Sequence, residues 1–174
     1  MNLIFGGTFL LVSIITRLIP HAPNVAPIAA LALWAGVYLP KRWGWALPIG
    51  AMLASDLFVG FYDLRLMATV YGSFIVTVGI GRVLRRWKDP SILLAGSLVA
   101  STFFFLVTNF AVWLLSSWYP HTPAGLMLSY TLGLPFFRNT LLGDLLYTGA
   151  FFGAYQGFGY LIRSKRAVAT PAPL

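Results

Sequence analysis

Long apolar runs, separated by short polar stretches, fill almost the whole chain. A helix that crosses a membrane needs about 20 mostly apolar residues, because the hydrocarbon core is about 30 Å thick. Six runs approach this length, and we predict one membrane-spanning helix in each: residues 3–19, 25–39, 45–61, 66–84, 92–115 and 139–162. A seventh run, residues 124–137, is too short to span and contains Pro135, so it predicts an interfacial or re-entrant segment before the sixth span.

Basic residues follow every second apolar run. Lys and Arg occur after the second run at 41 and 42, after the fourth between 82 and 88, and after the sixth between 163 and 166. Cytoplasmic loops of membrane proteins carry an excess of Lys and Arg, so this alternation predicts that both chain termini are cytoplasmic. No basic stretch precedes the first run, so we expect it to be a retained span and not a cleaved signal. We predict an all-α, multi-pass protein of the bacterial cytoplasmic (inner) membrane.

The composition supports a lipid environment. Hydrophobic residues make up 59% of the 174 residues and charged residues 9%, whereas soluble domains carry roughly 25% charged residues. The chain has no cysteine, which excludes a disulfide scaffold and Cys-based metal sites. We predict one transmembrane domain over residues 1–163 and a disordered cytoplasmic tail over residues 164–174.

The net charge of +8 lies at one predicted face. The cytoplasmic segments hold nine basic residues and one acid, Asp89, whereas the outer half holds three of each. This asymmetry is explained by membrane orientation and contact with anionic lipid, so we expect the lipid bilayer as a partner and no nucleic acid.

Polar residues gather at the predicted outer ends of the helices. Ionisable groups at membrane depth are costly and usually face the bundle interior or a water-filled cavity. We predict pairs between Arg17 or Arg138 and Asp56 or Asp144. Asn109 and Trp113 are four residues apart and share one helix face. The candidate substrate-binding residues are Arg17, His21, Asn24, Asp56, Asn109, Trp113, Arg138, Asn139, Asp144 and Tyr147. Two interpretations stay open, because these charges either bind a ligand or only brace the helices.

Small residues recur at helical spacing in the sixth run. Gly149, Gly153 and Gly157 are each four residues apart, which favours close helix packing in lipid. We predict that this stripe packs inside the bundle, and the alternative is that it docks a helix of a partner protein. Thr69, Ser73 and Thr77 form a hydroxyl stripe that bonds either across helices or to its own helix.

Signatures of catalysis are missing from the sequence. There is no phosphate-binding GxxxxGKS loop, no HExxH motif and no GxSxG elbow. The two histidines are 100 residues apart, without a clear third ligand for a metal. We therefore expect no enzyme activity, no metal and no cofactor.

Four segments carry a resemblance to a known family. They read RLIPHAPNVAPIAALALWAGVYL (17–39), SDLFVGFYD (55–63), LVTNFAVWL (106–114) and LPFFRNTLLGDLLYTGAFFG (134–153). The chain resembles a bacterial family of six-span membrane proteins that has no assigned activity. In size, number of spans and inside termini, it is also similar to the S components of energy-coupling factor (ECF) vitamin transporters.

The second resemblance implies a function. It implies a membrane subunit that captures a small micronutrient, such as a vitamin, from the outer side and works with an ATPase module and a transmembrane coupling protein. The alternative from another class is a non-catalytic scaffold or assembly subunit, and an intramembrane enzyme is the third. The identity of the small-molecule ligand does not follow from the sequence.

Overall fold

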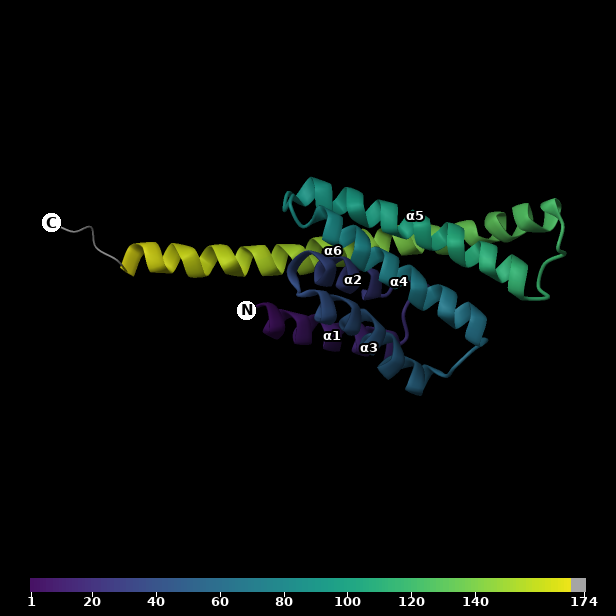
Figure 1. The fold of residues 1–174 in the computed structure, drawn as a ribbon, viewed down its shortest axis with the longest axis horizontal. Coiled ribbons are helices and arrows are strands. Elements are labelled where there is room, and N and C mark those ends of the chain that lie inside the picture. Colours follow the sequence, from purple (N-terminus) through teal and green to yellow (C-terminus); the bar gives the residue numbers. More distant parts are fainter. Residues whose placement is uncertain (170–174) are drawn as a thin grey trace.

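The computed structural model describes residues 1–169, and the side chains of residues 1–165, as an all-helical protein. Helices α1 (Asn2–Leu18), α2 (Ile28–Tyr38), α3 (Lys41–Val59), α4 (Leu64–Leu84), α5 (Pro90–Leu115) and α6 (Pro123–Ala169) follow one another along the chain (Figure 1). Two of these helices, α4 and α5, are long and apolar enough to cross a membrane. The helical class is thus confirmed, whereas six membrane crossings stay a prediction.

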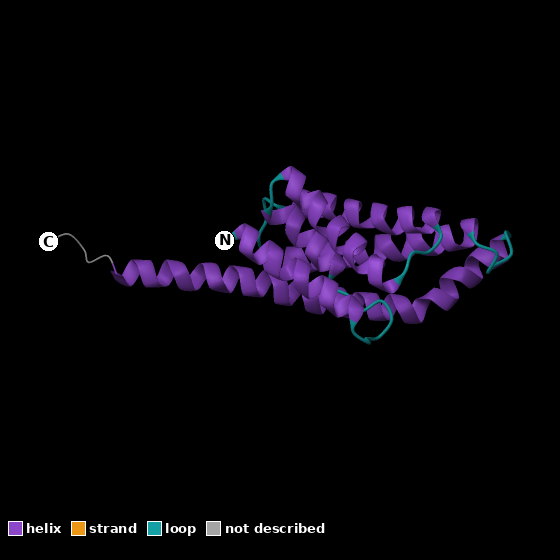
Figure 2. Cartoon of the chain, turned by 90° about the horizontal axis from the view of Figure 1, so that it is seen from below, coloured by secondary structure: helices purple, strands orange, loops and turns teal. Residues whose placement is uncertain are grey.

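The last helix differs from the sequence prediction. We expected an interruption between a short segment over residues 124–137 and a span that starts at Asn139, but α6 is one continuous helix of 47 residues. Pro135 lies inside it. Proline removes one backbone hydrogen bond and bends a helix without always ending it. Figure 2 shows this bend in the first third of α6, close to the α5–α6 loop.

Helix α6 also extends into the predicted tail. The helix covers residues 164–169, and residues 170–174 lie outside the described part of the chain. The division into a domain over 1–163 and a disordered tail over 164–174 therefore stays a prediction. At 47 residues α6 is about 70 Å long, about twice the thickness of a hydrocarbon core.

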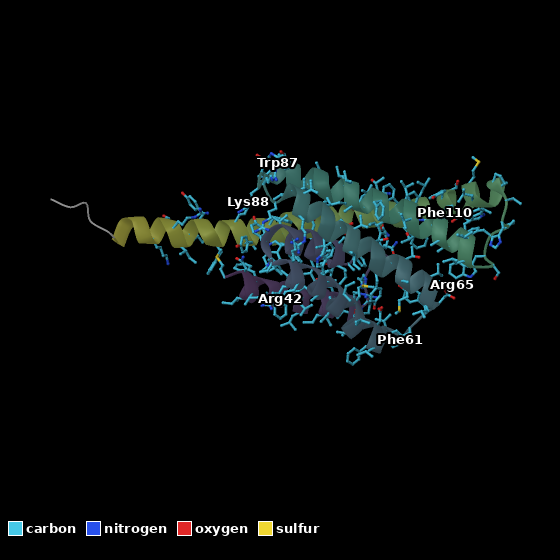
Figure 3. All side chains as sticks on the ribbon, in the orientation of Figure 1. Arg42, Phe61, Arg65, Trp87, Lys88 and Phe110 are labelled. Atoms are coloured by element: carbon cyan, nitrogen blue, oxygen red, sulfur yellow. The ribbon has the colours of Figure 1, made fainter. Side chains whose placement is uncertain are left out.

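The connections between helices lie at two opposite ends of the bundle. Arg42, Trp87 and Lys88 lie near the end that holds the N-terminus, whereas Phe61, Arg65 and Phe110 lie toward the other end (Figure 3). We refer to these as the basic end and the loop end. The loop end carries the connections over residues 19–27, 60–63 and 116–122.

Two aspartates begin the helices that follow the α3–α4 and α4–α5 loops. Asp63 accepts hydrogen bonds from the backbone N–H groups of Leu66 (3.1 Å) and Arg65 (3.0 Å), and these bonds lower the pKa of its carboxyl. At α5, the Ser91 hydroxyl and its backbone N–H donate to Asp89 and lower the pKa of that carboxyl. Both are N-caps, because they satisfy donors that the first helical turn leaves free.

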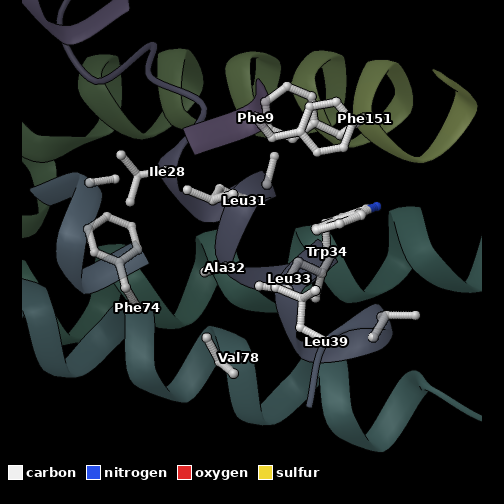
Figure 4. Packing of buried hydrophobic residues seen from close by; sticks show 14 of the residues in the cluster. Phe9, Ile28, Leu31, Ala32, Leu33, Trp34, Leu39, Phe74, Val78 and Phe151 are labelled. Carbon is white, nitrogen blue, oxygen red and sulfur yellow. The ribbon is translucent and has the colours of Figure 1, made fainter. Parts of the chain in front are cut away.

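Helix α2 lies at the centre of the bundle. It contacts each of the other five helices, and nearly all of its 11 residues are buried. A helix that is apolar on all sides must be enclosed by other elements or by lipid, and here other helices enclose it. The Trp34 ring is fully buried in this core, close to the stacked rings of Phe9 and Phe151, whose centroids are 4.0 Å apart (Figure 4).

The closest helix contact joins α2 and α4. A Cβ atom on Gly36 would lie 2.3 Å from the carbonyl oxygen of Val78, and one on Gly81 would lie 2.3 Å from that of Leu33. Both positions therefore require glycine, which lets two backbones approach directly.

The glycine stripe of α6 and the hydroxyl stripe of α4 do not join helices in this way. Among the described residues, no atom beyond the adjoining turns of α6 lies within 4 Å of a Cβ placed on Gly149, Gly153 or Gly157, and all three glycines are exposed. The prediction that this stripe packs inside the bundle is therefore wrong. The hydroxyls of residues 69, 73 and 77 each bond to a carbonyl one turn earlier in α4, so they do not join helices.

Candidate functional site

A cavity of about 250 Å³ lies toward the loop end of the bundle, between helices and beneath two loops. Every one of the six helices contributes at least one residue to it. Its lining comprises Arg17, Asn24, Ala26, Ile28, Ala29, Met52, Tyr62, Val70, Phe74, Phe104, Thr140 and Asp144. Most of these side chains are apolar, and a few polar groups converge among them, which is the usual composition of a small-molecule pocket.

One wall of the cavity carries a buried ion pair. The Nη2 atom of Arg17 lies 2.6 Å from Oδ1 of Asp56, and its Nη1 atom donates to the Ser55 hydroxyl at 2.8 Å. The second Asp56 oxygen accepts a hydrogen bond from the Tyr71 hydroxyl at 2.7 Å. Asp56 is 1% exposed and lies behind Arg17, so it supports the cavity wall without lining it. The prediction that these charges pair is thus confirmed for Arg17, whose partner among the two aspartates is Asp56.

The opposite wall carries a second buried carboxylate. Asp144 on α6 is 3% exposed and lines the cavity, and its Oδ2 atom lies 2.6 Å from the Ser101 hydroxyl on α5. Its predicted pairing with a base is wrong: over the part of the chain with described side chains, no ion pair joins Asp144 to Arg138 or to another basic residue. Arg138 is exposed on α6.

The α1–α2 loop covers the cavity in an unusual backbone conformation. Asn24 lines the cavity and has a φ angle of +63°, a left-handed conformation that Asn tolerates better than most residues. The backbone N–H of Val25 donates to the carbonyl of Ala22 at 3.1 Å. Asn139 on α6 donates to the carbonyl of Pro23 at 3.1 Å, so it fixes the loop over the cavity without lining it.

Tyr62 in the α3–α4 loop lines the same end of the cavity. Partial burial, together with the nearby Asp56 charge, raises the pKa of the Tyr62 hydroxyl. This hydroxyl therefore keeps its proton at neutral pH and can donate a hydrogen bond to a ligand.

Asn109 and Trp113 lie outside this cavity. The Asn109 side-chain amide donates to the backbone carbonyl of Phe105 at 2.8 Å, and the backbone carbonyl of Asn109 accepts from the Ser129 hydroxyl at 3.0 Å. The Trp113 indole N–H donates to the carbonyl of Pro120 at 3.0 Å. Both residues thus stabilise the hairpin between α5 and the start of α6.

Two further predicted residues also lie away from the cavity lining. His21 is exposed in the α1–α2 loop, with its Nδ1 atom 2.8 Å from the carbonyl oxygen of Ile19. Tyr147 on α6 packs against the hydrophobic core beside Phe151. Of the ten predicted residues, Arg17, Asn24 and Asp144 line the cavity, while Asp56 and Asn139 support its walls.

Several cavity residues were missed by the sequence analysis. Thr140 lies one turn before Asp144, so the spacing of the two residues on α6 was an available signal. Phe74, Phe104 and Val70 belong to uniformly apolar runs and carry no sequence signal of their own.

The described residues contain no group of three or more His, Asp or Glu side chains positioned to hold a metal ion. The arrangement therefore offers a mostly apolar cavity with one neutralised ion pair and one carboxylate that lacks a basic partner.

A family model matches residues 2–167, which is almost the whole chain. The chain belongs to the family of unknown function DUF6580. No curated protein and no solved structure matches it. Membership of DUF6580 agrees with the resemblance to a family without assigned activity. The membrane character of that resemblance and the similarity to ECF S components stay predictions.

Proposed function

We propose that this DUF6580 protein is an integral subunit of the bacterial cytoplasmic membrane that binds a small solute from the outer side for uptake. The observation that carries the proposal is the cavity of about 250 Å³, to which all six helices contribute and in which a buried carboxylate and a buried ion pair face apolar side chains. Buried charges are costly, so four helices that together hold Arg17, Asp56, Tyr71 and Asp144 around a cavity favour ligand binding over simple bracing.

The membrane placement in this proposal is supported by the surface of the bundle. Large apolar side chains are exposed on five of the six helices, and the sixth, α2, is enclosed by the others. The basic residues concentrate at the end that holds the N-terminus, which the positive-inside rule assigns to the cytoplasm. The loop end, with the cavity, then faces outward.

Partner proteins form the second part of the proposal. An S-component-like subunit works with a transmembrane coupling protein and an ATPase module, and the DUF6580 chain contains no phosphate-binding loop of its own. The uncovered stripe of Gly149, Gly153 and Gly157 on α6 favours a helix-docking role. The same observation favours the second candidate function, a non-catalytic scaffold or assembly subunit that binds partner helices but no solute.

Thermal unfolding of the purified full-length protein in detergent tests solute binding. A ligand that binds only the folded state raises the unfolding temperature, so a library of small water-soluble nutrients is screened for this shift. Substitution Ala29→Phe fills the cavity and is expected to abolish the shift, whereas Ala22→Phe in the exposed loop is the matched control that keeps it. A library without any stabilising compound, or stabilisation that survives in Ala29→Phe, contradicts solute binding in this cavity.

A further inference from the structure

Asp144 is the charged group of the cavity that has no basic partner among the described side chains. Its side chain is 3% exposed, and its Oδ2 atom contacts the Ser101 hydroxyl at 2.6 Å. Over the residues with described side chains, Oδ1 receives no hydrogen bond and no Lys, Arg or His pairs with the carboxylate. A buried carboxylate without a counter-charge is strongly destabilising, so it has to acquire either a proton or an external cation.

The neighbouring hydroxyl satisfies Asp144 only in part. The Ser101 Oγ atom lies 2.6 Å from Asp144 Oδ2 and 2.9 Å from the carbonyl oxygen of Ser97. A hydroxyl carries one proton, so these two acceptors compete for it. When Ser101 donates to Ser97, nothing on α5 donates to Asp144.

The other charged groups at the cavity compensate one another. Arg17 is paired with Asp56 at 2.6 Å, and Tyr71 occupies the remaining Asp56 oxygen. Tyr62 is neutral, because burial raises its pKa. An ionised Asp144 therefore gives the cavity a net charge of −1, although the protein as a whole carries +8.

The rest of the lining suits the apolar part of an organic cation. The rings of Phe74 and Phe104 line the cavity and stack on each other, with centroids 5.5 Å apart. Aromatic faces attract cations as well as apolar groups. Thr140, one turn from Asp144 on α6, adds a hydroxyl oxygen on the same side.

We propose that the solute bound by this cavity is a small organic cation, whose positively charged nitrogen pairs with Asp144 while its apolar part packs against Phe74 and Phe104. This inference rests on the proposed function, because it names the chemical class of the solute. In the absence of solute a proton takes the place of the cation: the neutral carboxyl donates to Ser101, and Ser101 donates to Ser97. Binding of the cation then releases that proton.

The absence of natural cysteine allows a direct test with charged thiol reagents. A single cysteine is introduced in the cavity by Ala29→Cys or in the exposed α1–α2 loop by Ala22→Cys. The purified full-length variants are treated with two charged methanethiosulfonates, the cationic trimethylammonium-ethyl and the anionic sulfonato-ethyl reagents, and with the smaller neutral methyl reagent. The cation-to-anion rate ratio at Ala29→Cys, divided by that at Ala22→Cys, reports the charge preference of the cavity.

The rates are measured at alkaline pH, so that the Asp144 carboxyl is ionised before the reagent enters. We expect the normalised ratio under these conditions to be on the order of tenfold, which corresponds to about 1.4 kcal/mol at 25 °C. Asp144→Asn is expected to return it to about one, whereas Ser101→Ala, which keeps the carboxylate, is expected to preserve it. A normalised ratio of one in the protein with Asp144 intact overturns the inference, and this comparison does not require the Asp144→Asn variant to fold. A preference that persists in a folded Asp144→Asn variant overturns it as well.

Failure of the proposed function gives a different result. If the cavity is closed to solutes, the neutral methyl reagent also fails to label Ala29→Cys while it labels Ala22→Cys. Labelling by all three reagents without a charge preference leaves an accessible cavity and contradicts only its selection of cations.

Discussion

The Arg17 guanidinium and the Asp56 carboxylate form an ion pair at 2.6 Å that joins α1 to α3 beside the cavity. The side chain of Asp56 is almost fully buried, whereas that of Arg17 retains 16% exposure toward the cavity. The pair therefore holds two helices together and, at the same time, places a neutralised base in the cavity wall. Removing one member leaves the other as an uncompensated buried charge.

We predict that Asp56→Asn lowers the free energy of unfolding by about 3–5 kcal/mol, because it leaves the Arg17 charge unpaired. The double variant Arg17→Met with Asp56→Asn is expected to lose less than the sum of the two single variants, because the two residues are coupled. Denaturant titration in detergent measures both. Arg65→Met, at the exposed Asp63–Arg65 pair of 3.5 Å, is the control and is expected to have little effect. Additive losses would contradict a coupled pair.

The contact between Gly36 and Gly81 predicts a second effect on stability. Gly36→Ala places a methyl group 2.3 Å from the Val78 carbonyl oxygen, so α2 and α4 must separate. Overpacking of this kind costs about 1–3 kcal/mol. Gly79→Ala, on α4 two residues before Gly81 but facing open space, is expected to leave stability unchanged or raise it by up to about 1 kcal/mol. Thermal unfolding of the two variants checks this order, and equal stability would contradict the close crossing.

A third prediction concerns which residues affect solute binding: Thr140 lines the cavity and Asn109 does not. Thr140→Leu adds bulk inside the cavity and is expected to weaken binding of any stabilising solute by at least about tenfold, or 1.4 kcal/mol. Asn109→Ala is expected to leave the affinity unchanged, because Asn109 bonds within the α5–α6 hairpin. Isothermal titration calorimetry measures both affinities. A large loss in Asn109→Ala with none in Thr140→Leu would place the site in the hairpin.

The sequence predicts the helices and part of the site for a physical reason. Charged residues in long apolar runs must turn inward, so Arg17, Asp56 and Asp144 were recognisable as buried groups from their positions alone. The partner of each charge depends on which helices are neighbours, and sequence spacing does not specify that. The prediction left the partners open: Asp56 pairs with Arg17, whereas Asp144 bonds to Ser101 on α5 and has no arginine partner among the described side chains.

Neighbouring helices also explain the incorrect assignments. The four-residue spacing of Asn109 and Trp113 shows that they share a face. That face turns away from the cavity, because Trp113 bonds to Pro120 in the α5–α6 loop and the Asn109 side chain lies against Gly133 on α6. The central position of α2 could not be predicted from the sequence either. A helix surrounded by lipid and a helix surrounded by other helices are both apolar on all sides. Glycine stripes share this ambiguity: Gly36 packs tightly, whereas Gly149, Gly153 and Gly157 face open space.

Labelling of Ala29→Cys from each side of the membrane tests whether the solute cavity is open to the outer side. The membrane-impermeant trimethylammonium-ethyl methanethiosulfonate is applied to right-side-out and to inside-out vesicles, with Ala22→Cys as the loop-end control and Ser91→Cys as the basic-end control. We predict that Ala29→Cys reacts in right-side-out vesicles together with Ala22→Cys, and that Ser91→Cys alone reacts in inside-out vesicles. Reaction of Ala29→Cys only from the side of Ser91→Cys, or from neither side, would contradict it.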